Sequence, residues 1–193
     1  MNVRKTMVSA LALSCITLAA FGWVSQAGES DTFDSSAGFT FPRIKGHGKV
    51  VQLPDAVDQP RDGSKICVDI TAGGSPKEIN PAIEKVARFV NIYAGAGKRP
   101  ANVRFTVILH GKATLAALNN ESYAKQWQVD RNPNIPLFKK LKEAGVEILV
   151  CGQSLMHKGG RQEDVAGEVR IAVSALTVNV NRQLDGFAFI PLH

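Results

Sequence analysis

The run Val103–Leu109 (VRFTVIL), followed at once by His110 and Gly111, decides the fold of this chain. Its nearly continuous apolar character is typical of a strand that is buried on both faces, as strands in parallel sheets are. Four other short runs have a similar β-branched and apolar character, at residues 66–70, 146–150, 169–172 and 187–190. We therefore predict a sheet of about five strands.

Helical patterns separate these runs. Ser75-Pro76-Lys77-Glu78 has the form of a capping box and predicts the start of a helix that ends at Gly95. Further helices are expected from residue 113, from 135 to Gly145, and from Ser174 as the capping residue to about residue 184. Strands that alternate with helices are joined by right-handed crossovers. The sequence thus predicts one α/β layered domain whose mostly parallel sheet is covered on both faces.

Composition and charge exclude several classes of protein. With 193 residues, of which 45% are apolar, the chain can bury an ordinary single core. The net charge of +6 comes from scattered basic residues, so we expect no nucleic-acid partner. The glycine-rich fingerprints of dinucleotide and nucleotide sites are missing, and no cofactor is predicted.

Residues 1–27 have the pattern of a secretory signal peptide. Arg4 and Lys5 precede the uncharged run Met7–Ala20, and Ser25-Gln26-Ala27 offers small residues to a signal peptidase. Cleavage there predicts an exported, periplasmic protein. The alternative is an uncleaved membrane anchor, because residues 7–24 carry no charge over a span just long enough for a bilayer. Residues 28–64 lack periodicity and are interpreted as an N-terminal extension to the domain at 65–193.

The candidate site lies where the predicted strands end. Ligands of open parallel sheets bind outside the carboxyl ends of the strands, and residues 71–75, 110–112 and 151–154 follow three such ends. We expect Cys151 and His110 to be neighbours there, as candidate catalytic residues. The candidate substrate-binding residues beside them are Gly111, Lys112, Gly152, Gln153 and Ser154.

Cys151 is the candidate nucleophile. It follows a strand and precedes a helix start, where the helix dipole and free N–H groups favour the thiolate. Gly152 would leave the sulfur open to a substrate, so we expect an exposed thiol. The alternative is that Cys151 is a small buried hydrophobic residue, as free cysteines usually are.

The histidines and Lys112 have alternative interpretations too. His110 either acts as a base or orienting group for the thiol or makes a structural hydrogen bond at the strand end. Lys112 either lowers the pKa of the thiol or faces water, and His157 is expected to be solvated. Cys151, His110 and His157 contain no closely spaced ligand pair, so a soft-metal carrier is the weakest hypothesis and no metal is predicted.

Cys67 is the contrasting thiol. It lies near the start of a predicted strand between Ile66 and Val68, which indicates an inert core position. Five residues of strand span roughly 16 Å, so Cys67 and Cys151 lie too far apart for a disulfide.

The order of several short motifs resembles the DsrE/DsrF-like sulfur-relay family from about residue 65 to residue 193. The motifs are VILHG (107–111), NPN (132–134), AGVEILVCGQS (144–154), SAL (174–176) and QLDGF (183–187). The resemblance implies a flavodoxin-like three-layer fold and a sulfur carrier that holds a persulfide on Cys151. It also implies a small sulfur donor or a thiol protein as partner, and a homo-oligomer, trimer or hexamer. The predicted export and the extension at 28–64 depart from the family pattern, and a non-catalytic binding or assembly module of the same fold is the alternative.

Overall fold

The computed structural model describes residues 38–97 and 99–193. The predicted signal peptide at 1–27 and the first ten residues of the extension lie outside this part of the chain. No helix in the two described ranges is long and apolar enough to cross a membrane.

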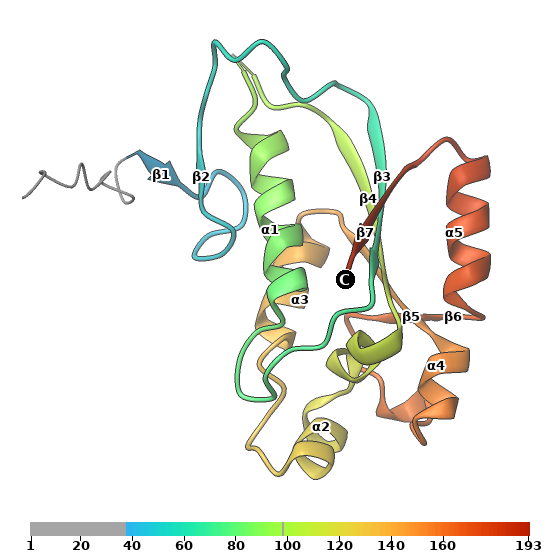
Figure 1. Ribbon diagram of the computed structural model, residues 1–193. Helices are drawn as coiled ribbons and strands as arrows, with labels where there is room; N and C mark the ends of the chain where they lie inside the picture. Colours follow the sequence, from blue (N-terminus) through green and yellow to red (C-terminus); the bar gives the residue numbers. More distant parts are fainter. Residues whose placement is uncertain (1–37, 98) are drawn as a thin grey trace, which may run out of the picture. The chain divides into compact units, whose positions relative to one another are not determined.

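Five parallel strands form the main sheet, as predicted (Figure 1). Their order across the sheet is β6-β5-β4-β3-β7. Counted along the chain this order is 4-3-2-1-5, whereas flavodoxin itself has 2-1-3-4-5. The strands are β3 (Ser64–Ile70), β4 (Val103–Leu109), β5 (Glu147–Cys151), β6 (Arg170–Ala172) and β7 (Ala188–Leu192).

Helices cover both faces of this sheet and give the flavodoxin-like three-layer α/β architecture (Figure 1). Helices α1 (Pro81–Ala94) and α3 (Ile135–Glu143) share the larger core with one face, and α5 (Ala175–Leu184) packs on the other. The chain moves from β3 to β6 in one direction and then returns to pair β7 with β3. Because crossovers are right-handed, this reversal places α5 on the opposite face.

Helix α1 begins later than the sequence predicts. Its N-cap is Asn80, whose Oδ1 accepts a hydrogen bond from the Ala82 backbone N–H at 2.8 Å. The Asn80 N–H itself donates to Oδ1 of Asn134 at 2.8 Å, so a contact from a distant part of the chain fixes the helix start. The predicted cap at Ser75 is therefore wrong, and residues 75–78 form only an isolated turn.

Short helices surround the carboxyl edge of the sheet. A 3₁₀ helix, η1 (Gly111–Ala117), precedes α2 (Asn120–Trp127), and α4 (Gly152–His157) precedes a second 3₁₀ helix, η2 (Gln162–Asp164). Leu118, Tyr123 and Leu155 form a small core that joins these elements. This core holds α4 in place directly after Cys151.

Residues 38–64 lie against α1. Their strands β1 (Phe39–Thr40) and β2 (Val50–Val51) pair only with each other in this part of the chain, so they add no strand to the main sheet. The buried Asn91 of α1 accepts the N–H groups of Arg43 and Ile44, and its Nδ2 donates to the carbonyls of residues 47 and 48. The extension therefore drapes over the helix and contributes Ile44 to the core.

Candidate functional site

The ends of β4 and β5 bring His110 and Cys151 together. Leu109 pairs with Val150, so the next residues in register are His110 and Cys151. The His110 N–H donates to the carbonyl of Ile70 at 3.0 Å and extends the ladder by one residue. Strand alternation then points both side chains toward the face covered by α5.

This is also the point where the crossovers diverge. The connection from β5 to β6 contributes Ala166 and Val169 to the core shared with α1 and α3. The connection after β6 leads instead into α5 on the opposite face, and Cys151 pairs with Ala172 of β6. Cys151 therefore lies at the topological switch point, where open α/β sheets bind their ligands.

The Cys151 residue is buried, with only 5% of its surface exposed. It packs in a small cluster with Ile108, Leu149, Ala175 and Val178. The expectation of an exposed thiol is wrong because the first turn of α5 covers the end of β5. The cover is thin, since Ala175 is the first residue of that helix and its neighbour Leu176 is exposed.

Burial raises the pKa of the Cys151 thiol, but hydrogen bonds more than compensate and the net shift is downward from 9.0. The groups that lower this pKa are the side chain of Ser154 and the backbone N–H groups of Ser154, Ala175 and Gln153. The Ser154 N–H lies 3.4 Å from the sulfur, so Cys151 also serves as the N-cap of α4. Donors aimed at a sulfur stabilise its thiolate.

Cys67 is tuned in the opposite direction. It is completely buried, and burial, reinforced by the negative charge of Asp69, raises its pKa from 9.0 to about 11. Arg182 opposes this shift without cancelling it. Cys67 and Cys151 are both free thiols, and Cys67 lies in the core as predicted.

His110 is oriented by an aspartate that the sequence reasoning missed. Its Nε2 is hydrogen-bonded to Oδ1 of Asp69. Asp69 is buried in β3, and the His110 side chain is 26% exposed. A carboxylate within an otherwise apolar strand was the available signal, because a buried charge requires a partner.

Of the three predicted binding residues that follow Cys151, only Ser154 and Gln153 act on its sulfur. Ser154 donates its N–H to it, and the N–H of Gln153 helps to lower its pKa, although the Gln153 residue is exposed. Gly152 instead packs against the end of β6, where an added Cβ would lie 3.0 Å from the carbonyl oxygen of Ala172. The expectation that Gly152 opens a path to the sulfur is therefore wrong.

The residues after β4 turn toward β3. Gly111 has a φ of +56° and lies against Thr71, and the Lys112 N–H donates to the carbonyl of Thr71 at 3.1 Å. The Lys112 side chain lies beside Gly73, so it is placed at the end of β3 and not beside Cys151.

His157 is exposed in the last turn of α4. Within residues 38–97 and 99–193 no group of three or more acidic, histidine or cysteine side chains is arranged to hold a metal ion.

Comparison of the chain with known protein families agrees with the resemblance that its motifs indicated. The model of the DsrE/DsrF-like family matches residues 65–192. The chain belongs to the DsrE/DsrF-like family. Among solved structures it is similar to a protein of unknown function, MTH1491, from Methanobacterium thermoautotrophicum. That similarity has 18% identity and a TM-score of 0.49 and covers 67% of this chain and 99% of that one. No curated protein matches the chain.

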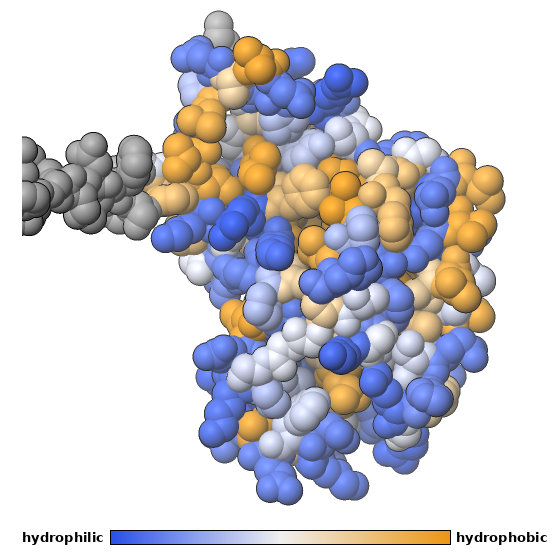
Figure 2. Space-filling view, viewed as in Figure 1, coloured by the Kyte–Doolittle hydropathy of each residue, from blue (hydrophilic) through white to orange (hydrophobic). Residues whose placement is uncertain are grey.

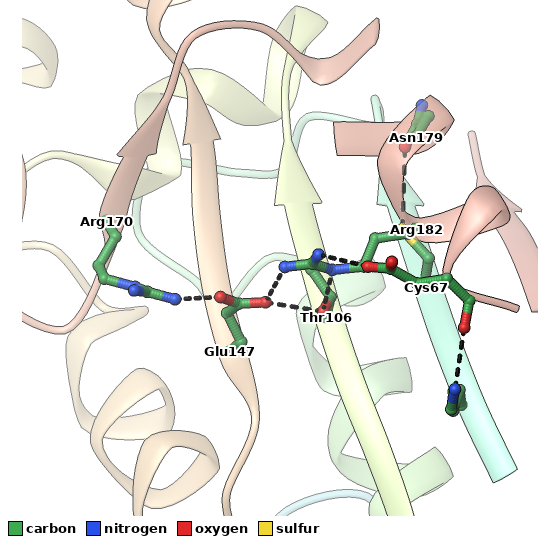
Figure 3. A network of polar contacts seen from close by, with 8 residues as sticks. Cys67, Thr106, Glu147, Arg170, Asn179 and Arg182 are labelled. Carbon is green, nitrogen blue, oxygen red and sulfur yellow. Dashed lines mark hydrogen bonds and ion pairs between the residues drawn. The ribbon is translucent and has the colours of Figure 1, made fainter. Parts of the chain in front are cut away.

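In this member of the DsrE/DsrF-like family, a charged network holds α5 on the sheet (Figure 3). Glu147 of β5 accepts hydrogen bonds from Arg182 at 2.7 Å and from the hydroxyl of Thr106 at 2.8 Å, and it also pairs with Arg170. Burial alone would raise the pKa of Glu147, yet the bonds from Arg182 and Thr106 lower it. The network lies at the amino end of β5, four residues before Cys151, so it positions α5 without touching the thiol.

Proposed function

We propose that this protein carries sulfane sulfur as a persulfide on Cys151 and passes it to another thiol. The observation that carries the proposal is the hydrogen bonding of the Cys151 sulfur, which lowers its pKa, whereas the pKa of the other described thiol, Cys67, is raised. The thiolate is the nucleophile in thiol chemistry, so these opposite shifts make Cys151 the reactive cysteine. Membership of the DsrE/DsrF-like family supports the same chemistry.

The transfer needs no oxidant. The Cys151 thiolate attacks the outer sulfur of a donor persulfide, R–S–S–H, and forms a new S–S bond. The S–S bond of the donor breaks and the R–S⁻ leaving group takes a proton. An acceptor thiolate then attacks the outer sulfur of the Cys151 persulfide, which releases the Cys151 thiolate again. The donor reaches the sulfur when the first turn of α5 opens, because terminal turns open more easily than a helix interior.

Mass spectrometry tests this proposal. The intact chain is treated with an aliphatic persulfide and digested, and we expect a gain of about 32 Da on the Cys151 peptide, the mass of one sulfur atom. Cys151→Ser should abolish the gain, and Cys67→Ser is the matched control that should keep it. An unmodified Cys151 peptide in the folded wild-type protein would contradict the proposal.

We also propose that the chain forms a homo-oligomer through α5. Leu176, Val180 and Leu184 follow each other at four-residue spacing and are 78%, 55% and 81% exposed. Apolar atoms are visible along the α5 side of the molecule in Figure 2. A helical stripe of this kind is typical of an interface. This stripe is also what favours the alternative function, an assembly module in which Cys151 only packs.

The oligomer and the alternative function can both be tested. Light scattering should give a trimer or hexamer for the wild type and a smaller species for Val180→Lys. Asn181→Lys, exposed on the same helix but further around it from Leu176 and Val180, is the control. A monomeric wild type would contradict the proposed oligomer. An oligomer whose Cys151 reacts with thiol reagents only after denaturation would favour the assembly module.

We further propose that the protein is exported to the periplasm by its first 27 residues. The support is the charged start, the apolar run and the small residues before Gly28. N-terminal sequencing of the protein from cell fractions should find Gly28 as the first residue in the periplasmic fraction. An intact leader in the membrane fraction would instead support the uncleaved anchor.

A further inference from the structure

A buried chain of polar contacts leads from α5 to the side chain of His110. Oδ1 of Asp69 pairs with His110 Nε2, and Oδ2 of the same carboxylate accepts a hydrogen bond from Nδ2 of Asn179 at 2.9 Å. Asn179 Oδ1 lies 3.8 Å from the sulfur of Cys67, which donates its S–H (Figure 3). Both oxygens of the buried carboxylate are thus used within the fold.

This chain fixes the orientation of the Asn179 amide. A carboxylate only accepts hydrogen bonds, so the NH₂ group of Asn179 must face Asp69 and its carbonyl must face Cys67. The raised pKa of Cys67 keeps its S–H available as the donor at that carbonyl. Each group therefore has one consistent role, which is the condition for a polar network to be rigid.

The same chain selects the tautomer of His110. A neutral imidazole carries one N–H, and the Asp69 carboxylate can accept it only at Nε2. Nδ1 is then left with a free lone pair when the ring is neutral, and with a transferable proton when the ring is charged. Because His110 follows Leu109 in register with Cys151 and is partly exposed, Nδ1 is the ring atom available for chemistry at the sulfur.

We propose that Asp69, held in place by Asn179, positions His110 so that Nδ1 gives a proton to the thiolate that leaves during transfer at Cys151. The inference rests on the proposed function and adds the source of the proton. In the first step the imidazolium protonates R–S⁻ as the donor S–S bond breaks and becomes neutral. In the return step neutral Nδ1 takes the proton of the acceptor thiol, whose thiolate attacks the persulfide, so the proton balance closes.

Helix α5 serves this site from two successive turns. The Ala175 N–H helps to lower the pKa of the Cys151 thiol, and Asn179, one turn later on the same face, holds Asp69. Asp69 and Asn179 touch neither the sulfur nor the reacting thiols, so they are positioning residues and His110 is the catalytic acid and base. The arrangement predicts that a change at Asp69 acts only through His110.

Thiol–disulfide exchange at Cys151 tests the inference without requiring persulfide chemistry. A dialkyl disulfide releases a basic thiolate that needs a proton, whereas an aromatic disulfide releases a thiolate that is stable without one. With the dialkyl reagent, His110→Gln and Asp69→Asn should each slow mixed-disulfide formation by about 10²-fold, a usual contribution of general acid catalysis. With the aromatic reagent the rate of each variant should stay within about twofold of the wild-type rate, because acid catalysis is then unnecessary.

A double mutant shows whether Asp69 acts through His110. Asp69→Asn in the His110→Gln background should slow the dialkyl reaction no further. Asn179→Ala should have a smaller effect of the same kind, and Gln183→Ala, one turn further on the exposed surface, is the matched control. Additive losses, or equal losses with both reagents, would show a structural role for Asp69 and overturn the inference.

Nitrogen-15 NMR of the wild-type protein gives a readout that needs no variant. The neutral His110 ring should carry its proton on Nε2, and Asp69→Asn should shift the tautomer ratio. A ring protonated on Nδ1 in the wild type would overturn the inference even if every variant failed to fold. If the exchange and NMR results are as expected but Cys151 accepts no sulfane sulfur, the proposed function fails and the proton-transfer role of His110 stands.

Discussion

The buried Cys67 thiol should make the protein less stable in alkali. Its pKa rises from 9.0 to about 11 on folding, because burial and the nearby Asp69 charge disfavour the thiolate. Between these two pH values the unfolded chain loses the Cys67 proton while the folded chain keeps it. The unfolded state then binds fewer protons, so the free energy of unfolding falls as the pH rises through this window. A shift of two pKa units corresponds to about 2.7 kcal/mol once the window has been passed.

Urea unfolding under reducing conditions at pH 8 and pH 11 measures this loss, with Cys67→Ala as the comparison. The variant starts from a lower stability because it leaves a cavity, but it should lose about 2–3 kcal/mol less than the wild type between the two pH values. Cys151 contributes to the pH dependence of stability with the opposite sign. Its lowered pKa raises the free energy of unfolding as the pH rises from the pKa in the folded state to 9.0. Cys151→Ser should therefore make the alkaline loss larger. Equal losses in the wild type and Cys67→Ala would refute the reasoning.

Three further predictions concern the supports of the fold. Asn91→Ala removes four hydrogen bonds of 2.7–2.9 Å to the backbone of the extension and should cost about 3–4 kcal/mol in urea unfolding at an unchanged m value; a cost below about 1 kcal/mol would mean that the extension is not anchored there. Glu147→Gln removes the carboxylate that pairs with Arg182 at 2.7 Å and leaves only the longer pair with Asp185 at 3.4 Å. The loss should cost about 1–3 kcal/mol, because both side chains of the Glu147–Arg182 pair are largely buried. This cost should shrink as the pH falls below 4.5 and vanish only below the lowered pKa of Glu147 in the folded state, where the wild-type carboxylate is itself protonated; a pH-independent cost would contradict the assignment. Gly48→Ala should cost at least about 2 kcal/mol by thermal unfolding, because φ is +60° and the new Cβ would lie 2.1 Å from the Arg88 nitrogen; an unchanged melting temperature would exclude this close contact.

The sequence predicted the architecture better than the site. The bounds of β4 and the cap of α5 at Ser174 came out as predicted, because apolar periodicity and capping are local properties. The start of α1 was missed because Asn134, distant in sequence, sets it through the Asn80 N–H. Cys151 was placed correctly at the end of a strand, and β5 includes it as its last residue.

The details of the site depend on packing that no local pattern contains. The burial of Cys151 follows from the position of α5, which returns to the sheet only after β6. The pairing of Asp69 with His110 joins two neighbouring strands, and Asn179 joins them from a third element. In the sequence, only the carboxylate of Asp69 within the apolar run 66–70 could have indicated this pairing.

The rate of alkylation of each cysteine in the native protein, followed by peptide mass spectrometry against pH, tests the account most directly. Cys151 should be labelled in the folded state with a midpoint below pH 9.0, because hydrogen bonds lower its pKa. Cys67 in the same sample should resist labelling up to about pH 11. Labelling of Cys151 only under unfolding conditions, or at the same rate and midpoint as Cys67, would contradict the claim that Cys151 is the reactive thiol.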